Sequence, residues 1–276
     1  MIKDNIQISI ITLTKNNKIE LLKTLKSIEN QRRNFLTELI IIDGSNKNEF
    51  IKNKNLIDKK FFKKNITDIF INQISSENIS IKGIYPCMNY GKKIAKGKFL
   101  IFLNSGDTFF NNISLQTLFK KSLYLDSKRG LIFGQANIIS PTNINWYFPG
   151  KRLKNFERWL KIFEPNHQSM LVANPLANKY DFPLDVNSLA DGYWKRNIIN
   201  NSSEVIYIKK PIVKFYLNGI SSSKPSKRFL SNIIKNKKIS IFRKFTFLIK
   251  YILPLKLFYL YYLSQKLKSL LIDLII

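Results

Sequence analysis

Two aspartates follow apolar runs of the sequence at the point where each run stops. Asp43 comes after the run 39–42, and Asp107 closes the polar turn Asn-Ser-Gly-Asp at 104–107, which follows the run 98–103. In open parallel sheets, ligands bind beyond the carboxyl ends of the strands. Either aspartate alone is more often a turn former. Together, on adjacent strands, they predict one ligand site, for which a metal ion is a candidate ligand.

The elements that must position these carboxylates follow from the spacing of apolar residues. Continuous apolar runs at 8–13 and 38–42 are typical of strands buried on both faces, and the apolar residues within 19–28 recur at helical spacing. A strand, a helix and a second strand of this kind predict a βαβ unit with a parallel sheet. The other elements expected in this half are a helix at 46–65, a strand at 69–71, a loop at 75–85, a helix at 86–96 and a strand at 98–103.

Beyond residue 110 the pattern becomes less regular. Asn112 or Ser114 can cap a helix that runs to about residue 124. The remaining expected elements are strands at 130–139, 169–173 and 205–216 and a short helix at 155–163. The order of elements predicts an α/β fold with a mostly parallel central sheet, followed by a mixed half.

Composition limits the class of protein. The chain has 276 residues, of which 45% are hydrophobic, so it can bury the core of one large domain, with or without an appendage. Its one cysteine, Cys87, excludes an internal disulfide framework and a cysteine-based zinc site, and a reducing compartment is the simplest interpretation. The polar first residues and the absence of a run of about 18 apolar residues predict neither a signal peptide nor a transmembrane helix.

The charge is strongly positive. The formal net charge is +28, and an abundance of Lys, Asn and Ile suggests that codon bias explains part of it. The rest gathers in the tail 224–276, which holds twelve basic residues and one acid among many apolar ones. This composition is typical of amphipathic helices on an anionic membrane surface. The alternative is a pair of helices packed on the domain with solvated lysines; we favour the membrane because the apolar content exceeds one packed stripe.

The common nucleotide-binding signatures are absent. The sequence contains no G-x-x-x-x-G-K-[ST] motif and no G-x-G-x-x-G motif after its first strand. The chain is therefore predicted to be neither a P-loop enzyme nor a dinucleotide-dependent dehydrogenase.

Several segments together resemble a known family. ISIITLTKN at 8–16, ELIIIDGS at 38–45 and GIYPCMNYGKKIAKGKFLIFLNSGD at 83–107 are similar to the inverting family 2 glycosyltransferases of the bacterial surface-polysaccharide type. The likeness continues more weakly through HQSML at 167–171, LADGYWKR at 189–196 and FYLNGISSS at 215–223. It implies a GT-A fold and transfer of a sugar from a nucleotide-sugar, with UDP as the expected nucleotide, to an acceptor hydroxyl.

The resemblance gives the turn 104–107 a role. The turn stands in the place of the family's D-x-D motif, which uses Mn²⁺ or Mg²⁺ to neutralise the diphosphate leaving group. Asp107 is the one charged metal ligand expected here, so the ion should bind weakly without nucleotide. Asn104 replaces the first carboxylate and is expected to bond the ribose, while Gly106 lets the backbone approach a phosphate.

Other residues acquire roles in the same way. Asp43 matches the family's acid that recognises the base, and Thr12 matches a position beside that base. His167 and Gln168 match a segment near the diphosphate and the donor sugar, so either is expected to contact them. Metal ligation by His167 is the less favoured alternative.

The reaction also needs a base that takes the proton of the acceptor hydroxyl. Asp191 matches the family's catalytic carboxylate, and without the resemblance we would interpret it as a helix N-cap. Asn89 and Lys92 precede the site on the helix 86–96; we expect a polar residue at the helix start and a solvated lysine, rather than nucleotide contacts.

The sequence departs from the family at two positions. Ile81 and Pro86 stand where related sequences carry acids, in the loop that lines the nucleotide. The predicted division is a GT-A domain at 1–223, made of a nucleotide-binding half (1–110) and an acceptor half (111–223), and a basic membrane-associating tail at 224–276.

Three functions are compatible with these features. The favoured one is a metal-dependent glycosyltransferase, peripheral on the cytoplasmic face of the membrane, with a lipid-linked or glycan acceptor in surface polysaccharide or lipopolysaccharide synthesis. The second is an inactive relative that acts as a membrane scaffold. This alternative remains because acids are missing at positions 81 and 86. The third, a nucleic-acid-binding protein, lacks any binding motif, and its basic excess lies in an apolar tail, so we expect no nucleic acid partner.

Overall fold

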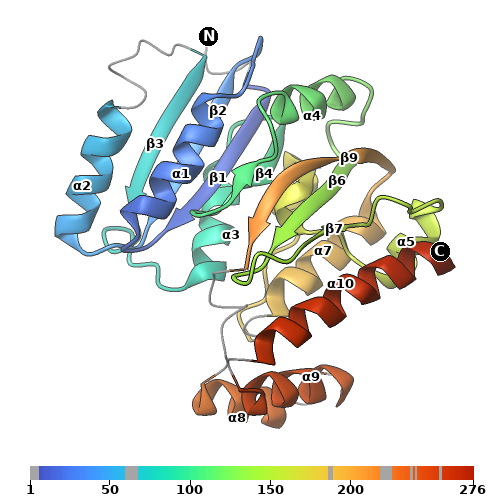
Figure 1. The fold of residues 1–276 in the computed structure, drawn as a ribbon. Helices are drawn as coiled ribbons and strands as arrows, with labels where there is room; N and C mark the ends of the chain where they lie inside the picture. The colour runs from blue at the N-terminus through green and yellow to red at the C-terminus, as the bar shows by residue number, and fades with distance from the viewer. Residues whose placement is uncertain are drawn as a thin grey trace.

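The four apolar runs of the first half form one parallel ladder. In the computed structural model, which describes residues 6–59, 68–185, 189–217, 226–236, 239, 241–254 and 257–276, the ladder has the order β3-β2-β1-β4. Its strands are β1 (Ile8–Thr14), β2 (Thr37–Asp43), β3 (Ile69–Ser75) and β4 (Phe99–Phe102). The strands β1, β2 and β4 are mainly apolar because helices cover both faces of the sheet (Figure 1), whereas β3 includes the polar residues Asn72 and Gln73.

The register brings the carboxyl ends of three strands together. Thr14 of β1 lies opposite Asp43 of β2, which in turn lies opposite Ser75 of β3. The helices that connect these strands are α1 (Lys18–Glu29), α2 (Lys47–Ile57) and α3 (Ile84–Ile94). Gly91 lets α3 approach the sheet, since a Cβ there would meet the Ile11 side chain at 2.7 Å.

The second half extends the same sheet with mixed pairing. Its strands are β5 (Thr108–Phe109), β6 (Gly130–Ile139), β7 (Asn145–Phe148), β8 (Met170–Ala173) and β9 (Glu204–Tyr216). Its helices are α4 (Ser114–Ser122), α5 (Phe156–Ile162), the 3₁₀ turn η3 (His167–Ser169), α6 (Asn174–Lys179) and α7 (Ala190–Asn201). Strand β8 pairs antiparallel with both β4 and β6, so one sheet spans both predicted halves.

Most predicted elements are confirmed, with some differences in their bounds and caps. Strand β3 continues to Ser75 beyond the expected 69–71, and α3 begins two residues before the expected 86. Asn112 and Ser114 do not cap α4: the cap position is Ile113, which makes no side-chain bond, and Ser114 instead accepts the backbone N–H of Asn111. Helix α2 ends at Ile57, and residues 60–65 of the expected helix lie outside the described residues, as does the segment 218–223.

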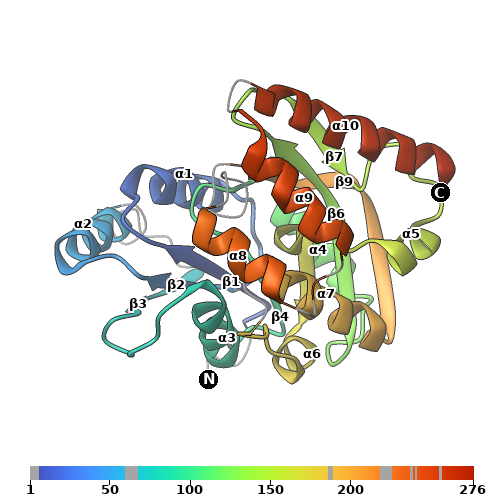
Figure 2. The same cartoon turned by 90° about the horizontal axis from the view of Figure 1, so that it is seen from below.

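The tail contains α8 (Lys227–Lys235), α9 (Ile241–Ile252) and α10 (Phe258–Ile275), which lie along one side of the molecule (Figure 2). Trp146 and Tyr262 form a small core of their own that joins α10 to β7, and Ser269 donates to the Tyr147 carbonyl at 2.9 Å. Within the described ranges, no helix combines the length and the apolar character that crossing a membrane requires.

Candidate functional site

The turn that ends β4 lies at the edge where the parallel strands finish. Backbone bonds hold it there: Ser105 N donates to the Leu13 carbonyl at 3.0 Å, and Asp107 N donates to the Asn104 carbonyl at 3.0 Å. Thr12 adds a third link, because its hydroxyl donates to the Leu103 carbonyl at 2.9 Å. The structure therefore brings Thr12, Asn104 and Asp107 together, as the sequence predicts.

Gly106 takes a backbone conformation that favours glycine. Its φ is +98°, and a Cβ there would stand 2.0 Å from Oε2 of Glu20. Its N–H points into α1, toward the hydroxyl of Thr24 at 3.0 Å and the carbonyl of Glu20 at 3.3 Å. The first turns of α1 thus shape the site, although the sequence patterns did not single out these residues.

Asp107 is 5% exposed, and both of its oxygens accept hydrogen bonds. Oδ1 accepts from the Tyr216 backbone N–H at 2.7 Å, and Oδ2 accepts from Nε2 of Gln168 at 2.5 Å. Burial raises the pKa of Asp107 to about 7, against the opposing effect of these bonds and of Lys23, with Glu20 adding to the rise. A nearby cation would therefore favour the charged carboxylate.

Gln168 joins this carboxylate to the rest of the turn. It belongs to η3, which precedes β8, and its Oε1 accepts from Asn104 N at 3.1 Å while Nε2 bonds Asp107. Asn166 is the N-cap of η3, and its Oδ1 accepts from Gln168 N at 2.9 Å. Gln168 thus lies against the turn 104–107, while its predicted contact with the donor stays a prediction.

His167, the residue before Gln168, faces a different partner. Its Nδ1 lies 3.8 Å from Oδ2 of Asp191, and its ring stands edge-on to Phe102 at a centroid distance of 6.2 Å. Burial lowers the pKa of His167 to about 4, against the opposing charge of Asp191. Its Nε2 is buried without a hydrogen-bond partner. A neutral imidazole with one free ring nitrogen is able to bond a ligand.

Asp191 lies in the first turn of α7. The helix cap position is Leu189, so Asp191 is not the N-cap that the alternative interpretation expected. Its Oδ2 is 3.4 Å from Nζ of Lys195. Burial alone would raise the pKa of Asp191, but the charge of Lys195, with His167, lowers it below its ordinary value. The carboxylate is ionised at neutral pH, as a proton acceptor must be.

Asp43 is fully buried at the end of β2. Its Oδ1 accepts from Ser45 N at 2.9 Å, and its Oδ2 accepts from Asn53 Nδ2 at 2.9 Å and Gln73 Nε2 at 3.1 Å. These bonds tie β2 to α2 and β3. Asp43 therefore organises this edge of the sheet.

Buried polar atoms without a partner gather at the same edge. The described residues contain nine such side-chain atoms, and six of them lie around Asp43 or Asp107. The six atoms are Thr14 Oγ1, Asn53 Oδ1, Gln73 Oε1, Asn104 Oδ1, Ser105 Oγ and His167 Nε2. Buried polar groups in folded proteins are normally bonded, so their concentration here supports a site that receives a polar ligand.

The oxygen atoms of the turn 104–107 supply some, but not all, of the ligands that a hard divalent cation needs. The turn supplies oxygen atoms from Asp107, Asn104 and Ser105, which is the ligand type that Mg²⁺ and Mn²⁺ prefer. However, no group of three His, Cys, Asp or Glu side chains able to hold a metal occurs in the part of the chain that the structure describes. A bound ion would need further ligands from a diphosphate or water.

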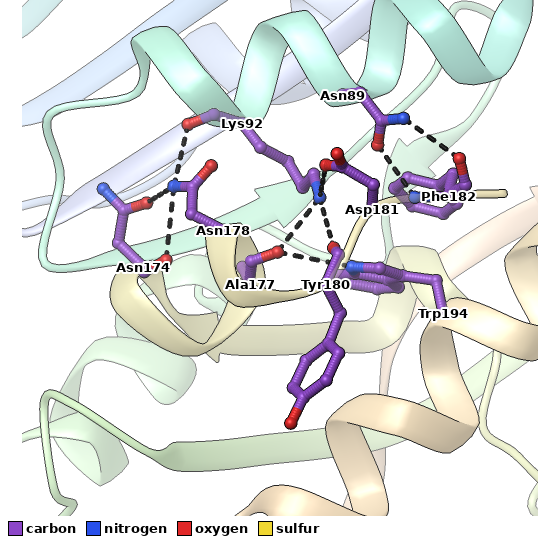
Figure 3. Close-up of polar contacts among 9 residues, drawn as sticks. All are labelled: Asn89, Lys92, Asn174, Ala177, Asn178, Tyr180, Asp181, Phe182 and Trp194. Carbon is purple, nitrogen blue, oxygen red and sulfur yellow. Dashed lines mark hydrogen bonds and ion pairs between the residues drawn. The ribbon is translucent and has the colours of Figure 1, made fainter.

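Lys92 is not the solvated lysine that the sequence suggested. It is fully buried, and Nζ donates to the carbonyls of Ala177 at 3.0 Å and Tyr180 at 2.5 Å and lies 3.2 Å from Asp181 (Figure 3). Burial lowers the pKa of Lys92, although Asp181 opposes the shift. The ammonium thus binds the last carbonyls of α6, a favourable place for a cation.

Asn89 also differs from its prediction. It lies inside α3, not at its start, and its amide exchanges two hydrogen bonds with the backbone of Phe182, at 2.9 and 3.0 Å. Phe182 stacks on Trp194 at 4.7 Å, and Phe102 meets both rings edge-on. This aromatic cluster connects α3 to α7, and through Phe102 it packs against His167.

Lys23 and Tyr216 complete the group of site residues that sequence patterns missed. Nζ of Lys23 lies 2.9 Å from the centroid of the Tyr216 ring. The positive charge of Lys23 also lowers the pKa of Asp107, against the effect of burial. The one feature of the sequence that could have indicated Lys23 is its position in α1, which directly follows the end of β1. A cavity of about 750 Å³ lies elsewhere, between α5, α7 and the start of β9.

Comparisons with known proteins support the fold. No protein-family model matches the sequence, and no curated protein matches it. S. aureus TarS residues 1–349 in complex with UDP is 14% identical, with 90% of this chain and 71% of that chain covered and a TM-score of 0.59. The complex of the same protein with UDP-GlcNAc is 16% identical, with 90% of this chain and 72% of that chain covered and a TM-score of 0.58.

A third solved structure is the mannosyltransferase PcManGT from Pyrobaculum calidifontis in complex with GDP-Man and Mn²⁺. It is 13% identical, with 82% of this chain and 59% of that chain covered and a TM-score of 0.54. The chain has a glycosyltransferase fold. The predicted α/β GT-A architecture is confirmed, and at these identities the likeness concerns the fold alone.

Proposed function

We propose that the chain transfers a sugar from a nucleotide-sugar, with UDP as the expected nucleotide, to an acceptor hydroxyl with inversion. One observation carries the proposal. The two adjacent residues of η3 face the two groups that the reaction needs: Gln168 bonds Asp107, and His167 lies beside Asp191. The diphosphate side and the proton-accepting side of a transferase site are thus joined by one short turn.

In this proposal Asp191 is the general base. An ionised carboxylate accepts the proton of the acceptor hydroxyl while that oxygen attacks the anomeric carbon from the face opposite the diphosphate. Lys195 and His167 flank the carboxylate and hold it in place. The unpartnered Nε2 of His167 and Oδ1 of Asn104 are available to bond the donor.

Asp107, with Asn104, would hold Mn²⁺ or Mg²⁺. When bound, the ion would offset the negative charge of the leaving diphosphate. PcManGT binds GDP-Man with Mn²⁺, which supports a divalent cofactor here. Because the turn supplies one carboxylate, we expect the ion to bind together with the nucleotide rather than before it.

The acceptor half of the proposal rests on the tail. A basic, apolar tail favours an anionic membrane surface, and a lipid-linked or glycan acceptor would be met there. We therefore propose a peripheral enzyme on the cytoplasmic face of the membrane, in surface polysaccharide or lipopolysaccharide synthesis.

Calorimetry of nucleotide binding tests the donor half. UDP, GDP and ADP would be titrated with and without Mn²⁺ into the wild type and Asp107→Asn, with Asp126→Ala as a control at an exposed aspartate. We expect one nucleotide to bind in a Mn²⁺-dependent way, and Asp107→Asn alone to lose that dependence. If no nucleotide binds under either condition, the enzyme proposal fails and an inactive relative becomes the better description.

A further inference from the structure

The C-terminal helices expose an unusual share of the apolar surface. Twelve of the 21 large apolar side chains that are exposed among the described residues lie within 226–276. They are Ile234, Ile241, Phe245, Ile249, Ile252, Leu257, Tyr259, Leu260, Leu267, Leu270, Leu271 and Ile275. A concentration of this kind marks an interaction surface rather than the scattered exposure found on any protein.

In α9 the exposed residues form one stripe. Ile241, Phe245, Ile249 and Ile252 are spaced by four, four and three residues and are between 41% and 77% exposed. Lys250 is buried and lies 6.0 Å from the ring of Tyr261 in α10. At 3.6 residues per turn, Lys250 is on the side of α9 opposite this stripe, so the apolar stripe is the face that α9 turns outward.

In α10 the same arrangement recurs. Leu260, Leu267, Leu271 and Ile275 are spaced by seven, four and four residues and are between 52% and 70% exposed. The residues that fix α10 to β7 lie on the other face.

These fixing residues are Tyr262, which packs on Trp146, and Ser269, which bonds the Tyr147 carbonyl. They are seven residues apart and half a helical turn away from the α10 stripe. The helix is therefore anchored to the sheet by one face and presents the other to the exterior.

The charge of these helices matches an anionic surface. The tail 224–276 contains twelve basic residues and one acid, Asp273. Lys227 and Lys235 on α8 and Lys268 on α10 are exposed. Apolar faces flanked by lysines are the pattern of helices that lie in the plane of a membrane interface, where the lysines meet anionic headgroups.

We propose that the α9 and α10 stripes together form the surface that docks on an anionic lipid bilayer, with both helices parallel to it. The arrowheads of β3 and β9 point toward the side on which α8 and α9 lie, so the strand ends that carry the candidate site face the same side (Figure 1). This inference rests on the proposed function for the acceptor, and it places a lipid-linked acceptor within reach of the site.

Co-sedimentation with vesicles tests this surface. The full chain and the variant Phe245→Ser with Leu271→Ser would be mixed with phosphatidylglycerol–phosphatidylcholine vesicles and with phosphatidylcholine vesicles. The matched control is Leu123→Ser with Ile162→Ser, two apolar residues that are equally exposed but lie outside the tail. Thermal melting and UDP calorimetry on each sample report folding and the donor site separately.

We expect the wild type and the control to sediment with the anionic vesicles and much less with the neutral ones. The stripe variant should partition about tenfold more weakly or worse, because two large apolar side chains no longer leave water. Equal binding by wild type and stripe variant would overturn the inference. The inference would also be overturned if the wild type did not bind anionic vesicles. This includes the case in which the wild type forms a dimer and the stripe variant does not. UDP binding that persists in that case leaves the transferase proposal standing.

Discussion

Gln168 bridges two parts of the candidate site with a single amide: Nε2 donates to Oδ2 of Asp107 at 2.5 Å, and Oε1 accepts from Asn104 N at 3.1 Å. The side chain is buried, so both bonds are formed away from water. The conformation of the turn after β4 therefore depends on a residue more than sixty positions later in the sequence.

The first prediction concerns this bridge. Gln168→Leu keeps the approximate volume but leaves an Asp107 oxygen and the Asn104 N–H without a partner. We expect a loss of about 1–3 kcal/mol in the free energy of unfolding, and nucleotide affinity about tenfold lower, because the turn proposed to bind the diphosphate is no longer held in place. Urea unfolding and calorimetry measure the two effects.

Gln135→Leu provides the matched control. Gln135 is also buried, but its Nε2 bonds the Gly150 carbonyl and the Tyr207 hydroxyl, in the second half of the sheet. It should lower stability by a similar amount and leave nucleotide affinity unchanged. Equal affinity in both variants would mean that the bridge has a structural role only.

The second prediction concerns Gly106. Gly106→Ala should lower stability by at least about 1–2 kcal/mol, because alanine avoids a positive φ. Its Cβ would also meet Glu20. Gly44→Ala is the control: a Cβ at Gly44 would have its nearest neighbour, Ser76 Oγ, at 3.4 Å, an ordinary contact. Thermal melting of the two variants compares them, and equal melting temperatures would contradict the prediction.

The sequence was sufficient for the fold because its signals were local. Continuous apolar runs followed by polar turns identified β1, β2 and β4, and the shared direction of these strands places Asp43 and Asp107 at one edge. The prediction that the two aspartates follow adjacent strands is wrong, because β1 lies between β2 and β4. The roles of Thr12, Asp43, His167 and Asp191 remain predictions, with which the geometry is compatible.

The rest of the site depends on contacts that no local pattern contains. Lys92 looks like a surface lysine because its neighbours in sequence include Lys93, and what buries it is α6, some 85 residues later. Lys23 and Tyr216 meet only because β9 ends beside α1. Long-range packing of this kind overrides the ordinary preference of a lysine for solvent.

The third prediction concerns Lys92. Lys92→Met fills the space but removes the ammonium that the carbonyls of Ala177 and Tyr180 accept from. We expect a loss of about 1–3 kcal/mol in the free energy of unfolding, because the Tyr180 carbonyl loses this donor and the Ala177 carbonyl keeps only the 3.5 Å bond from Trp194 Nε1. Lys93→Met, at the exposed neighbouring position, should change stability by less than about 0.5 kcal/mol. If both variants are equally stable, the Lys92 ammonium does not stabilise the fold.

The fourth prediction concerns the protonation of His167. Burial lowers its pKa from 6.5 to about 4 in the folded chain. Between these values the unfolded chain binds a proton that the folded chain does not, so the free energy of unfolding should fall as the pH drops from 6.5 toward 4. The contribution of this one group is up to about 3 kcal/mol.

Two measurements check this. His167→Gln should remove that contribution. The first measurement is therefore the difference in the free energy of unfolding between wild type and variant across the pH range, in metal-free protein. The difference is needed because Asp107, whose pKa is raised to about 7, contributes with the opposite sign in the same range. The chain has a single histidine, so its imidazole C–H signals in proton NMR need no assignment. A titration midpoint near 6.5 in the folded protein would show that His167 is solvated, and would remove the basis for a neutral imidazole beside Asp191.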